Sequence, residues 1–582
     1  MNSTDRPPLR APRGFAAGLI PGLIAGLLAL ASCASPAGSQ TPPEGAGAPT
    51  TAQTPPAPAE PATPAPAPAP KQTPAPTPAP APQEPPVLRL VRERVPAGFE
   101  KTADEPELAK KIAELTALLP EDVRNTPGMS VETLHGLVDD LIRVGRAYLS
   151  RFPEGASYRE VLYPVARVLI LNYSRALLAE SQRLERETGR TPDLPTMDRV
   201  RKDYFVEVIH IIDEGIAAFT EGKQYCEFQK LRGISTFFAN RYAESAEAYR
   251  IVLAHCPDDP KTPESLLALL NAYLHDKKYD DAVLTADQFI TRFPRDDLLP
   301  HAYQLKAKTL TEAGRPEDAL EWWRSILDLL RIGASGVTTE IGGEPHTWAG
   351  EAQAAFQRYL DEGRFMIGFL LFVLDRYEEA KTSLAETLVE LSQLEAQGKI
   401  DPRSKVFLDR TRKMHEVLVA SVRSPAPDLS IGSWLDDVPL DPRAERGNVV
   451  VLLFAPFEQP RYEDIQGTLQ KYYAELWAEG LRVGWICDPK GFADIPSKLA
   501  RVGAQRQRLG LAYPIGIETE PQWPNFTRYQ ASVGGAAIVV IDRGGNVAWY
   551  DQDPTYRTER LLRGVIDRLL AEPKPGAKPA GG

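Results

Sequence analysis

Helical periodicity dominates the chain from residue 88 to residue 422. Apolar residues recur there every three or four positions, which predicts amphipathic helices that bury one face against their neighbours. Ahead of the clearest repeats, this pattern predicts helices over Glu107–Leu119, Val131–Arg151, Leu162–Glu185 and Met197–Phe219. An apolar face at this spacing is more typical of a protein core than of a binding stripe.

The helical region repeats itself. Tyr242, Tyr279 and Pro316 are each 37 residues apart, and small residues follow each of them at the same distance. This arrangement resembles the tetratricopeptide repeat, with its usual period of about 34 residues lengthened by three. The clearest copies span 226–328, and a further copy spans 361–395 after a Gly-rich insertion over 332–350. Four stacked helix pairs predict an all-α solenoid with a continuous core.

After residue 422 the pattern changes to strands that alternate with helices. The apolar runs Val449–Phe454 and Ala537–Ile541 are typical of buried strands, and helices are predicted over 465–479 and 558–570. Residues 424–573 thereby resemble the periplasmic thiol-disulfide oxidoreductases and peroxiredoxins, which implies an α/β thioredoxin-like domain. The expected fold class is a multidomain chain: a helical solenoid followed by this α/β domain.

The resemblance also implies a missing active site. In those families the first strand leads into a Cys-x-x-Cys, or a lone peroxidatic Cys, at a helix N-terminus that stabilises a thiolate. Here Glu458 and Arg461 occupy the two cysteine positions, and Ala536 stands where the relatives carry a cis-proline. Neither Glu458 nor Arg461 can exchange a disulfide. The pair is either part of a binding site or an ordinary helix-start ion pair, and no cofactor is expected.

The N-terminus resembles a bacterial lipoprotein signal. Basic residues precede the broken apolar stretch 15–31, which ends Leu30-Ala31-Ser32-Cys33. We expect a signal peptide over 1–32 and lipidation of Cys33, which would anchor the chain in the cell envelope, at the outer membrane or periplasmic side of a Gram-negative cell. The alternative is an ordinary signal peptide with an unrelated cysteine.

Low-complexity composition marks two further segments. Residues 33–87 join Cys33 to a stretch of Pro, Ala, Thr and Gly that has almost nothing to bury, so we predict a disordered linker. Residues 574–582 are expected to form a disordered tail.

Three cysteines remain in the body of the chain. The repeat register places Cys226 at the start of one helix and Cys256 at the end of the next, on the same side of a hairpin. A bridge between them is possible in an oxidising compartment, and two separate buried thiols are the alternative. Cys487 is interpreted as a packing residue just after a strand.

Charge and composition reduce the number of functional classes to consider. The chain has 67 basic and 78 acidic residues, a net charge of −11, which argues against nonspecific nucleic-acid binding. The seven histidines are scattered, without metal-ligand spacing. The sequence favours an envelope-anchored scaffold that binds an unknown protein or peptide through the concave face of its repeats. The alternatives are a thiol-disulfide oxidoreductase or peroxiredoxin-like enzyme that uses Cys487, and a thioredoxin-like domain that merely caps the solenoid.

Overall fold

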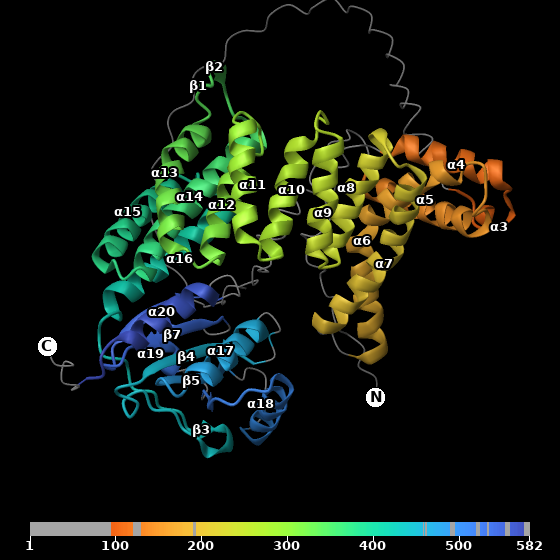
Figure 1. Ribbon diagram of the computed structural model, residues 1–582. Coiled ribbons are helices and arrows are strands. Elements are labelled where there is room, and N and C mark those ends of the chain that lie inside the picture. The colour runs from red at the N-terminus through yellow and green to blue at the C-terminus, as the bar shows by residue number, and fades with distance from the viewer. Residues whose placement is uncertain are drawn as a thin grey trace, which may run out of the picture. The chain divides into compact units, whose positions relative to one another are not determined.

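The computed structural model (Figure 1) describes most of the chain between residues 95 and 575. Within that range the segments not described are 120–129, 190–191, 193, 458, 460–461, 489–494, 519–523, 532–534, 553 and 555–558. The predicted signal peptide, Cys33, the linker and all but the first two residues of the predicted tail therefore lie outside the described residues. The chain divides into two compact units, 1–171 and 172–582.

The first unit is helical. Its elements are α3 (Phe99–Thr102), α4 (Glu105–Leu118), α5 (Val131–Arg151) and the first half of α6 (Tyr158–Thr188). Asp104 and Glu107 form a reciprocal capping box at the start of α4. A Cβ on Gly145 of α5 would lie 2.4 Å from a methyl group of Val165, so glycine lets α5 and α6 pack closely. The predicted helices are confirmed with small shifts at their ends.

Helix α6 is long and apolar enough to cross a membrane, with a mean hydropathy of 1.2 over its most apolar 18 residues. Half of that 18-residue stretch is buried inside the protein. Core helices of water-soluble proteins can be equally long and apolar, so length and hydropathy alone are weak evidence for a membrane span.

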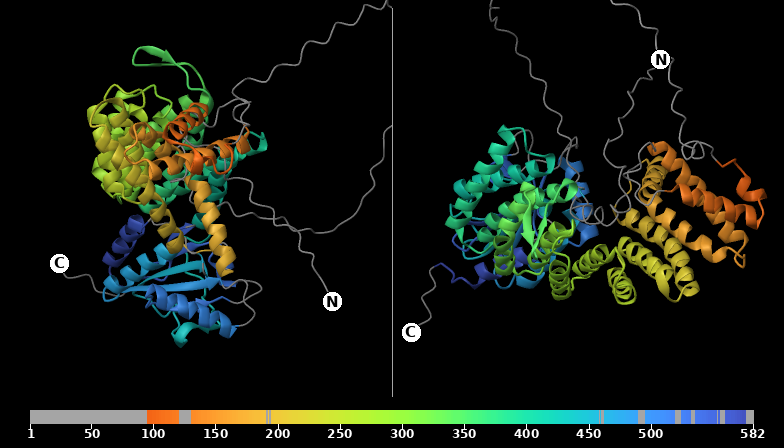
Figure 2. Two further views of the ribbon diagram at one scale, coloured as in Figure 1. Left: turned by 90° about the vertical axis from the view of Figure 1, so that its right-hand side faces the viewer. Right: turned by 90° about the horizontal axis from the view of Figure 1, so that it is seen from above.

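The second unit begins with the second half of α6, followed by α7 (Leu194–Ala218), and continues as helical hairpins. The pairs are α8 (Gly222–Phe238) with α9 (Tyr242–His255), α10 (Thr262–His275) with α11 (Tyr279–Arg292), α12 (Leu299–Glu312) with α13 (Pro316–Ser335), and α14 (Gly350–Val373) with α15 (Tyr377–Ala396), followed by α16 (Pro402–Ala420). Figure 2 shows the pairs side by side in chain order. The predicted pairing is confirmed, with the aromatic or Pro position opening each second helix.

The turn inside each hairpin has a common geometry. Asn240, Lys277, Gly314 and Asp375 all adopt the left-handed conformation, with φ between 60° and 74°. The next N–H bonds back to the first helix in every case, as from Lys278 to the Tyr273 carbonyl oxygen at 2.9 Å. This is the Schellman ending, in which glycine and asparagine are the favoured left-handed residues.

The predicted Gly-rich insertion is more ordered than its composition suggests. Helix α13 runs past the expected start of the insertion to Ser335, and a hairpin of β1 (Thr339–Ile341) and β2 (Glu344–His346) follows. Gly342 and Gly343 form its two-residue turn, both at positive φ. The glycines therefore make a hairpin turn rather than a loose loop.

The α/β domain contains a six-stranded sheet in the order β3-β6-β5-β4-β7-β8. Its strands are β3 (Ser433–Trp434), β4 (Val449–Pro456), β5 (Leu481–Asp488), β6 (Ile515–Ile517), β7 (Ala537–Ile541) and β8 (Val547–Gln552). Its helices are α17 (Glu463–Leu476), α18 (Ile495–Leu509), α19 (Pro524–Arg528) and α20 (Glu559–Ala571). Strands β4, β5 and β6 are parallel, whereas β7 and β8 are antiparallel to their neighbours. Every residue of β4 is buried, as its unbroken apolar run predicts.

Polar contacts join the α/β domain to the hairpin turns. Arg560 of α20 donates to the Ala313 carbonyl oxygen at 3.3 Å, and Arg568 donates to that of Val373 at 2.8 Å. The Arg560 guanidinium also lies 4.7 Å from the centre of the Tyr279 ring. Helix α20 thus contacts three successive turns along the side of the solenoid.

Candidate functional site

The sequence resemblance places the two cysteine positions of the relatives just after the last residue of β4. Glu458 and Arg461 lie outside the described residues, so their pairing stays a prediction. Phe457 is buried, and the Arg501 guanidinium lies 5.6 Å from the centre of its ring. Ala536 is buried immediately before β7, at the place the sequence predicts. Phe457 and Ala536 are therefore packed apolar groups at this edge, and Arg501 covers the Phe457 ring.

Cys487 lies inside β5 rather than after it, which corrects the sequence-based placement. It pairs with Ala455 of β4 and with Ile517 of β6, and its carbonyl oxygen accepts from the Glu518 N–H at 3.1 Å. Strand β5 extends beyond the expected end because it stays paired with β4 as far as Asp488, and β6 also pairs with Cys487. The cysteine is fully buried, so its thiol lacks the access that a reactive cysteine needs.

A second sulfur is missing from this domain. Cys487 is the sole cysteine between residues 424 and 573. Cys226 and Cys256 lie in the solenoid, where the structure joins them as a disulfide with 6.5 Å between their Cα atoms. Thiol-disulfide exchange within the domain would therefore lack a resolving partner.

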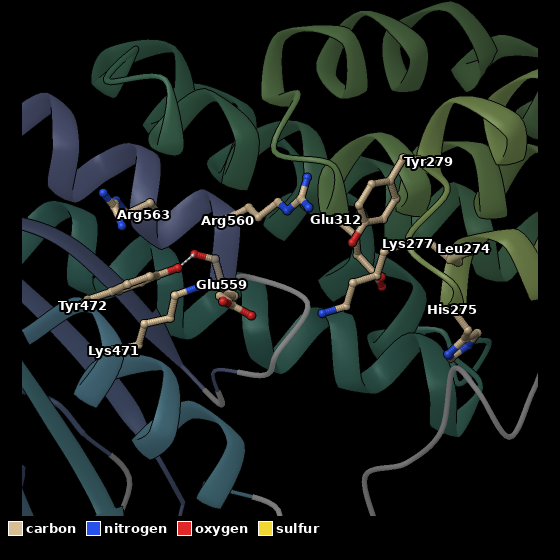
Figure 3. A pocket seen from close by; sticks show the side chains of 10 residues that line it. All are labelled: Leu274, His275, Lys277, Tyr279, Glu312, Lys471, Tyr472, Glu559, Arg560 and Arg563. Carbon is tan, nitrogen blue, oxygen red and sulfur yellow. Dashed lines mark hydrogen bonds between the residues drawn. The ribbon is translucent and has the colours of Figure 1, made fainter. Parts of the chain in front are cut away.

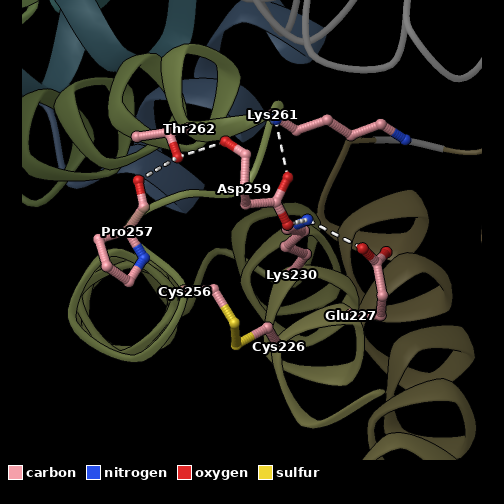
Figure 4. The surroundings of a disulfide bond; sticks show 8 residues. All are labelled: Cys226, Glu227, Lys230, Cys256, Pro257, Asp259, Lys261 and Thr262. Atoms are coloured by element: carbon pink, nitrogen blue, oxygen red, sulfur yellow. Dashed lines mark hydrogen bonds and ion pairs between the residues drawn. A yellow bond between two sulfur atoms is a disulfide. The ribbon is translucent and has the colours of Figure 1, made fainter. Parts of the chain in front are cut away.

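Figure 4 shows the surroundings of that disulfide at the end of the α8–α9 hairpin. Lys230 forms ion pairs with Glu227 and Asp259. The Asp259 carboxylate also accepts from the Lys261 N–H at 2.7 Å. The disulfide and the Lys230–Asp259 ion pair thus both hold α8 against the corner that follows α9. Because Lys230 pairs with both neighbouring carboxylates, we interpret this corner as structural rather than as a binding site.

A buried carboxylate that sequence reasoning missed lies near β6. Glu518 is 1% exposed and accepts from the N–H groups of Asn525 and Phe526, at 2.8 and 3.2 Å. The Asn525 amide also binds both backbone groups of Ser430, 95 residues away. Glu518 therefore caps the start of α19, and Asn525 ties that helix to the domain's entry segment. No local sequence pattern marks this contact, because Glu518 lies outside the usual capping positions.

The first helices of the two middle hairpins expose little surface. Eleven of the 14 residues of α10, and eleven of the 14 of α12, are buried. In α11 only four of 14 are buried, namely Ala282, Thr285, Ala286 and Phe289. A partner of these hairpins would therefore meet mainly second helices and turns. In the described residues there is also no group of three or more His, Cys, Asp or Glu side chains suited to a metal ion.

Comparisons with known proteins give matches among solved structures. No family model matches the chain, and no curated protein matches it. A thioredoxin-family thiol:disulfide interchange protein from Chlorobium tepidum TLS is 18% identical with a TM-score of 0.22, covering 25% of this chain and 97% of that one. A putative protein disulfide isomerase from Bacteroides thetaiotaomicron is 21% identical with a TM-score of 0.22, covering 26% and 92%.

A secreted disulfide oxidoreductase of Mycobacterium tuberculosis is 16% identical with a TM-score of 0.20, covering 24% of this chain and 96% of that one. The three neighbours are thus a thioredoxin-family interchange protein, a putative disulfide isomerase and a disulfide oxidoreductase. At such low identity and TM-score the likeness transfers no activity to this chain.

Proposed function

We propose that this protein is a cell-envelope lipoprotein that binds another protein through its helical hairpins and carries a thioredoxin-like domain without redox activity. One observation supports the lack of redox activity most strongly: Cys487, the lone cysteine of the domain, is fully buried within β5. An oxidoreductase of this type needs an accessible thiolate and a resolving sulfur. The domain therefore serves as a packed module, held against the hairpin turns through α20.

The partner surface follows from the exposure pattern. Because the first helices of the middle hairpins are mostly buried, we place the partner on second helices and turns rather than on a wide concave groove. Leu284 of α11 and Leu329 of α13 are 57% and 47% exposed, so these second helices offer apolar contact points. The net charge of −11 favours a protein partner over a nucleic acid.

Anchoring through Cys33 belongs to the same proposal. It is supported by the lipobox-like sequence Leu30-Ala31-Ser32-Cys33 and by the Pro-rich segment that follows. Acyl chains on this cysteine would hold the chain at a membrane, since each buried methylene contributes about 0.8 kcal/mol.

One experiment with two readouts tests anchor and binding. Cells express the full chain and its Cys33→Ser variant; fractionation should move the variant from the membrane pellet to the soluble or unprocessed pool. Chemical cross-linking followed by purification should capture the same protein partner with wild type and with Cys487→Ala. Membrane pelleting of a processed Cys33→Ser protein would contradict the anchor. Failure to capture any partner above an unrelated lipoprotein control would contradict the binding role.

A further inference from the structure

A pocket of about 370 Å³ lies between the solenoid and the α/β domain, both in the second unit (Figure 3). One wall comes from the α10–α11 turn, with Lys277 and Tyr279. The other comes from α17 and the start of α20, with Lys471, Glu559 and Arg560. Figure 3 shows the Lys277 side chain extending toward the α20 side and Arg560 extending toward the solenoid.

Some charges at this pocket are already paired. Arg563 binds Glu475 at 2.7 Å and Asp567 at 2.8 Å. Glu312 lies 3.9 Å from the ammonium nitrogen of Lys308, and both side chains are at most 10% exposed. Arg563 and its two carboxylates together carry a net charge of −1, whereas Glu312 and Lys308 neutralise each other.

The remaining groups give the pocket a positive surplus. Among the described residues no ion pair involves Lys277, Lys471 or Arg560, and Glu559 is the single carboxylate that faces them without one. The partners of Arg560, the Ala313 carbonyl oxygen and the Tyr279 ring, are neutral. Three cations against Glu559 and the single excess carboxylate beside Arg563 leave a net charge of +1 at the pocket, in a chain whose net charge is −11.

The backbone at Lys277 is an independent observation. Lys277 occupies the left-handed position of its turn, where the equivalent turns carry Asn240, Gly314 and Asp375. Lysine is less suited than any of these to this conformation, and strained positions cluster at functional sites. The turn therefore carries a lysine in a conformation that lysine disfavours, at the point where the turn lines the pocket.

Neutral hydrogen-bond groups complete the site. Burial raises the pKa of Tyr472 above its ordinary value, so its hydroxyl stays protonated and donates to the Glu559 carbonyl oxygen at 3.1 Å. This bond fixes the start of α20 against α17. Tyr279 presents a ring beside Arg560. The volume is at the lower end of the range for small-molecule pockets, about 300 to 1,000 Å³.

We propose that this pocket binds a small multivalent oxyanion, either a phosphate compound or a polycarboxylate. Lys277, Lys471 and Arg560 supply charge-assisted hydrogen bonds to its oxygens. Because the cations come from both walls, the bound anion also strengthens the contact between the solenoid and the α/β domain. The proposal is independent of the protein partner, so either can fail without the other.

Isothermal titration of the soluble full-chain Cys33→Ser protein tests the site, with pyrophosphate, citrate and inorganic phosphate as separate probes. Two further substitutions are made separately in this Cys33→Ser protein. Lys277→Asn keeps a residue suited to the turn, and Lys471→Gln removes the cation of the opposite wall. We expect at least one probe to bind, and each substitution to weaken it about tenfold, the effect of losing one charge-assisted bond. Lys399→Asn, a change at an exposed lysine elsewhere in the solenoid, should leave binding unchanged.

The three probes also distinguish the ligand class. Tighter binding of pyrophosphate than citrate assigns a phosphate compound, and the reverse assigns a polycarboxylate. Hydrogen exchange should slow in the α10–α11 turn and at the start of α20 when the probe is bound. Absence of binding by all three probes at millimolar concentration would overturn the proposal, as would equal affinity in a folded Lys277→Asn/Lys471→Gln double variant.

Discussion

Replacing Arg543 with alanine should lower the free energy of unfolding of the α/β domain by about 3 to 5 kcal/mol. The side chain is only 6% exposed. Its guanidinium donates to the carbonyl oxygens of Leu569 and Leu570 at the end of α20, at 3.3 and 2.6 Å. It also reaches those of Gly447 and Glu479, at 2.7 and 3.4 Å.

The size of the effect follows from what alanine would leave behind. The last carbonyl groups of a helix have no partner within the helix, and a cation there also offsets the negative end of its dipole. Removal of the guanidinium would leave buried carbonyl oxygens unsatisfied at several segments simultaneously. Lysine at this position should recover part of the loss, because it keeps the charge but lacks the planar fork.

Denaturant unfolding followed by tryptophan fluorescence provides the measurement, since Trp485 and Trp549 are fully buried in β5 and β8. The control is Arg528→Ala, which removes one exposed hydrogen bond of 3.3 Å to the Asp428 carbonyl oxygen and should cost below about 1 kcal/mol. Similar losses for both variants would show that the Arg543 bonds do not hold the domain together.

Removing the Cys226–Cys256 bridge should destabilise the first hairpin of the repeats by about 3 to 4 kcal/mol, according to the chain-entropy estimate for a loop of this length. The two residues are 30 positions apart and enclose nearly the whole α8–α9 pair. Cys226 is 1% exposed, so its replacement also removes buried packing. The loss should be local, because hairpins of this kind depend chiefly on their immediate neighbours.

Hydrogen exchange of oxidised wild type and of a Cys226→Ala/Cys256→Ala variant provides the test, with α8 and α9 as the reporting segments. Faster exchange should appear there in the variant and in wild type treated with a reductant. The reductant should have no further effect on the variant, which lacks the bridge. Two freely alkylating thiols in the untreated native protein would contradict the bridge itself.

Much of the helical fold could be predicted from the sequence, because each helix carries its own apolar periodicity. The 37-residue spacing of Tyr242, Tyr279 and Pro316 identifies the start of three second helices directly. Strands β4 and β7 were predictable because they are unbroken apolar runs. Strands β3 and β6 have only two and three residues, too few to show a pattern.

The site was less predictable, because it depends on contacts between distant residues. Cys487 was misplaced because the end of β5 is set by its pairing with β4, which continues to Asp488. The bond between Asn525 and Ser430 joins positions 95 residues apart, and the pocket joins Lys277 to Lys471. The residue pattern within a single helix or strand carries no information on such long-range contacts.

The most direct test of the central claim is a turnover assay on the full chain, with insulin disulfides and with hydrogen peroxide in the presence of a thiol donor. The account predicts rates equal to the protein-free background for both substrates, and equal rates for the Cys487→Ala variant. Turnover above background that disappears in a folded Cys487→Ala protein would contradict the account and establish a thiol-dependent enzyme.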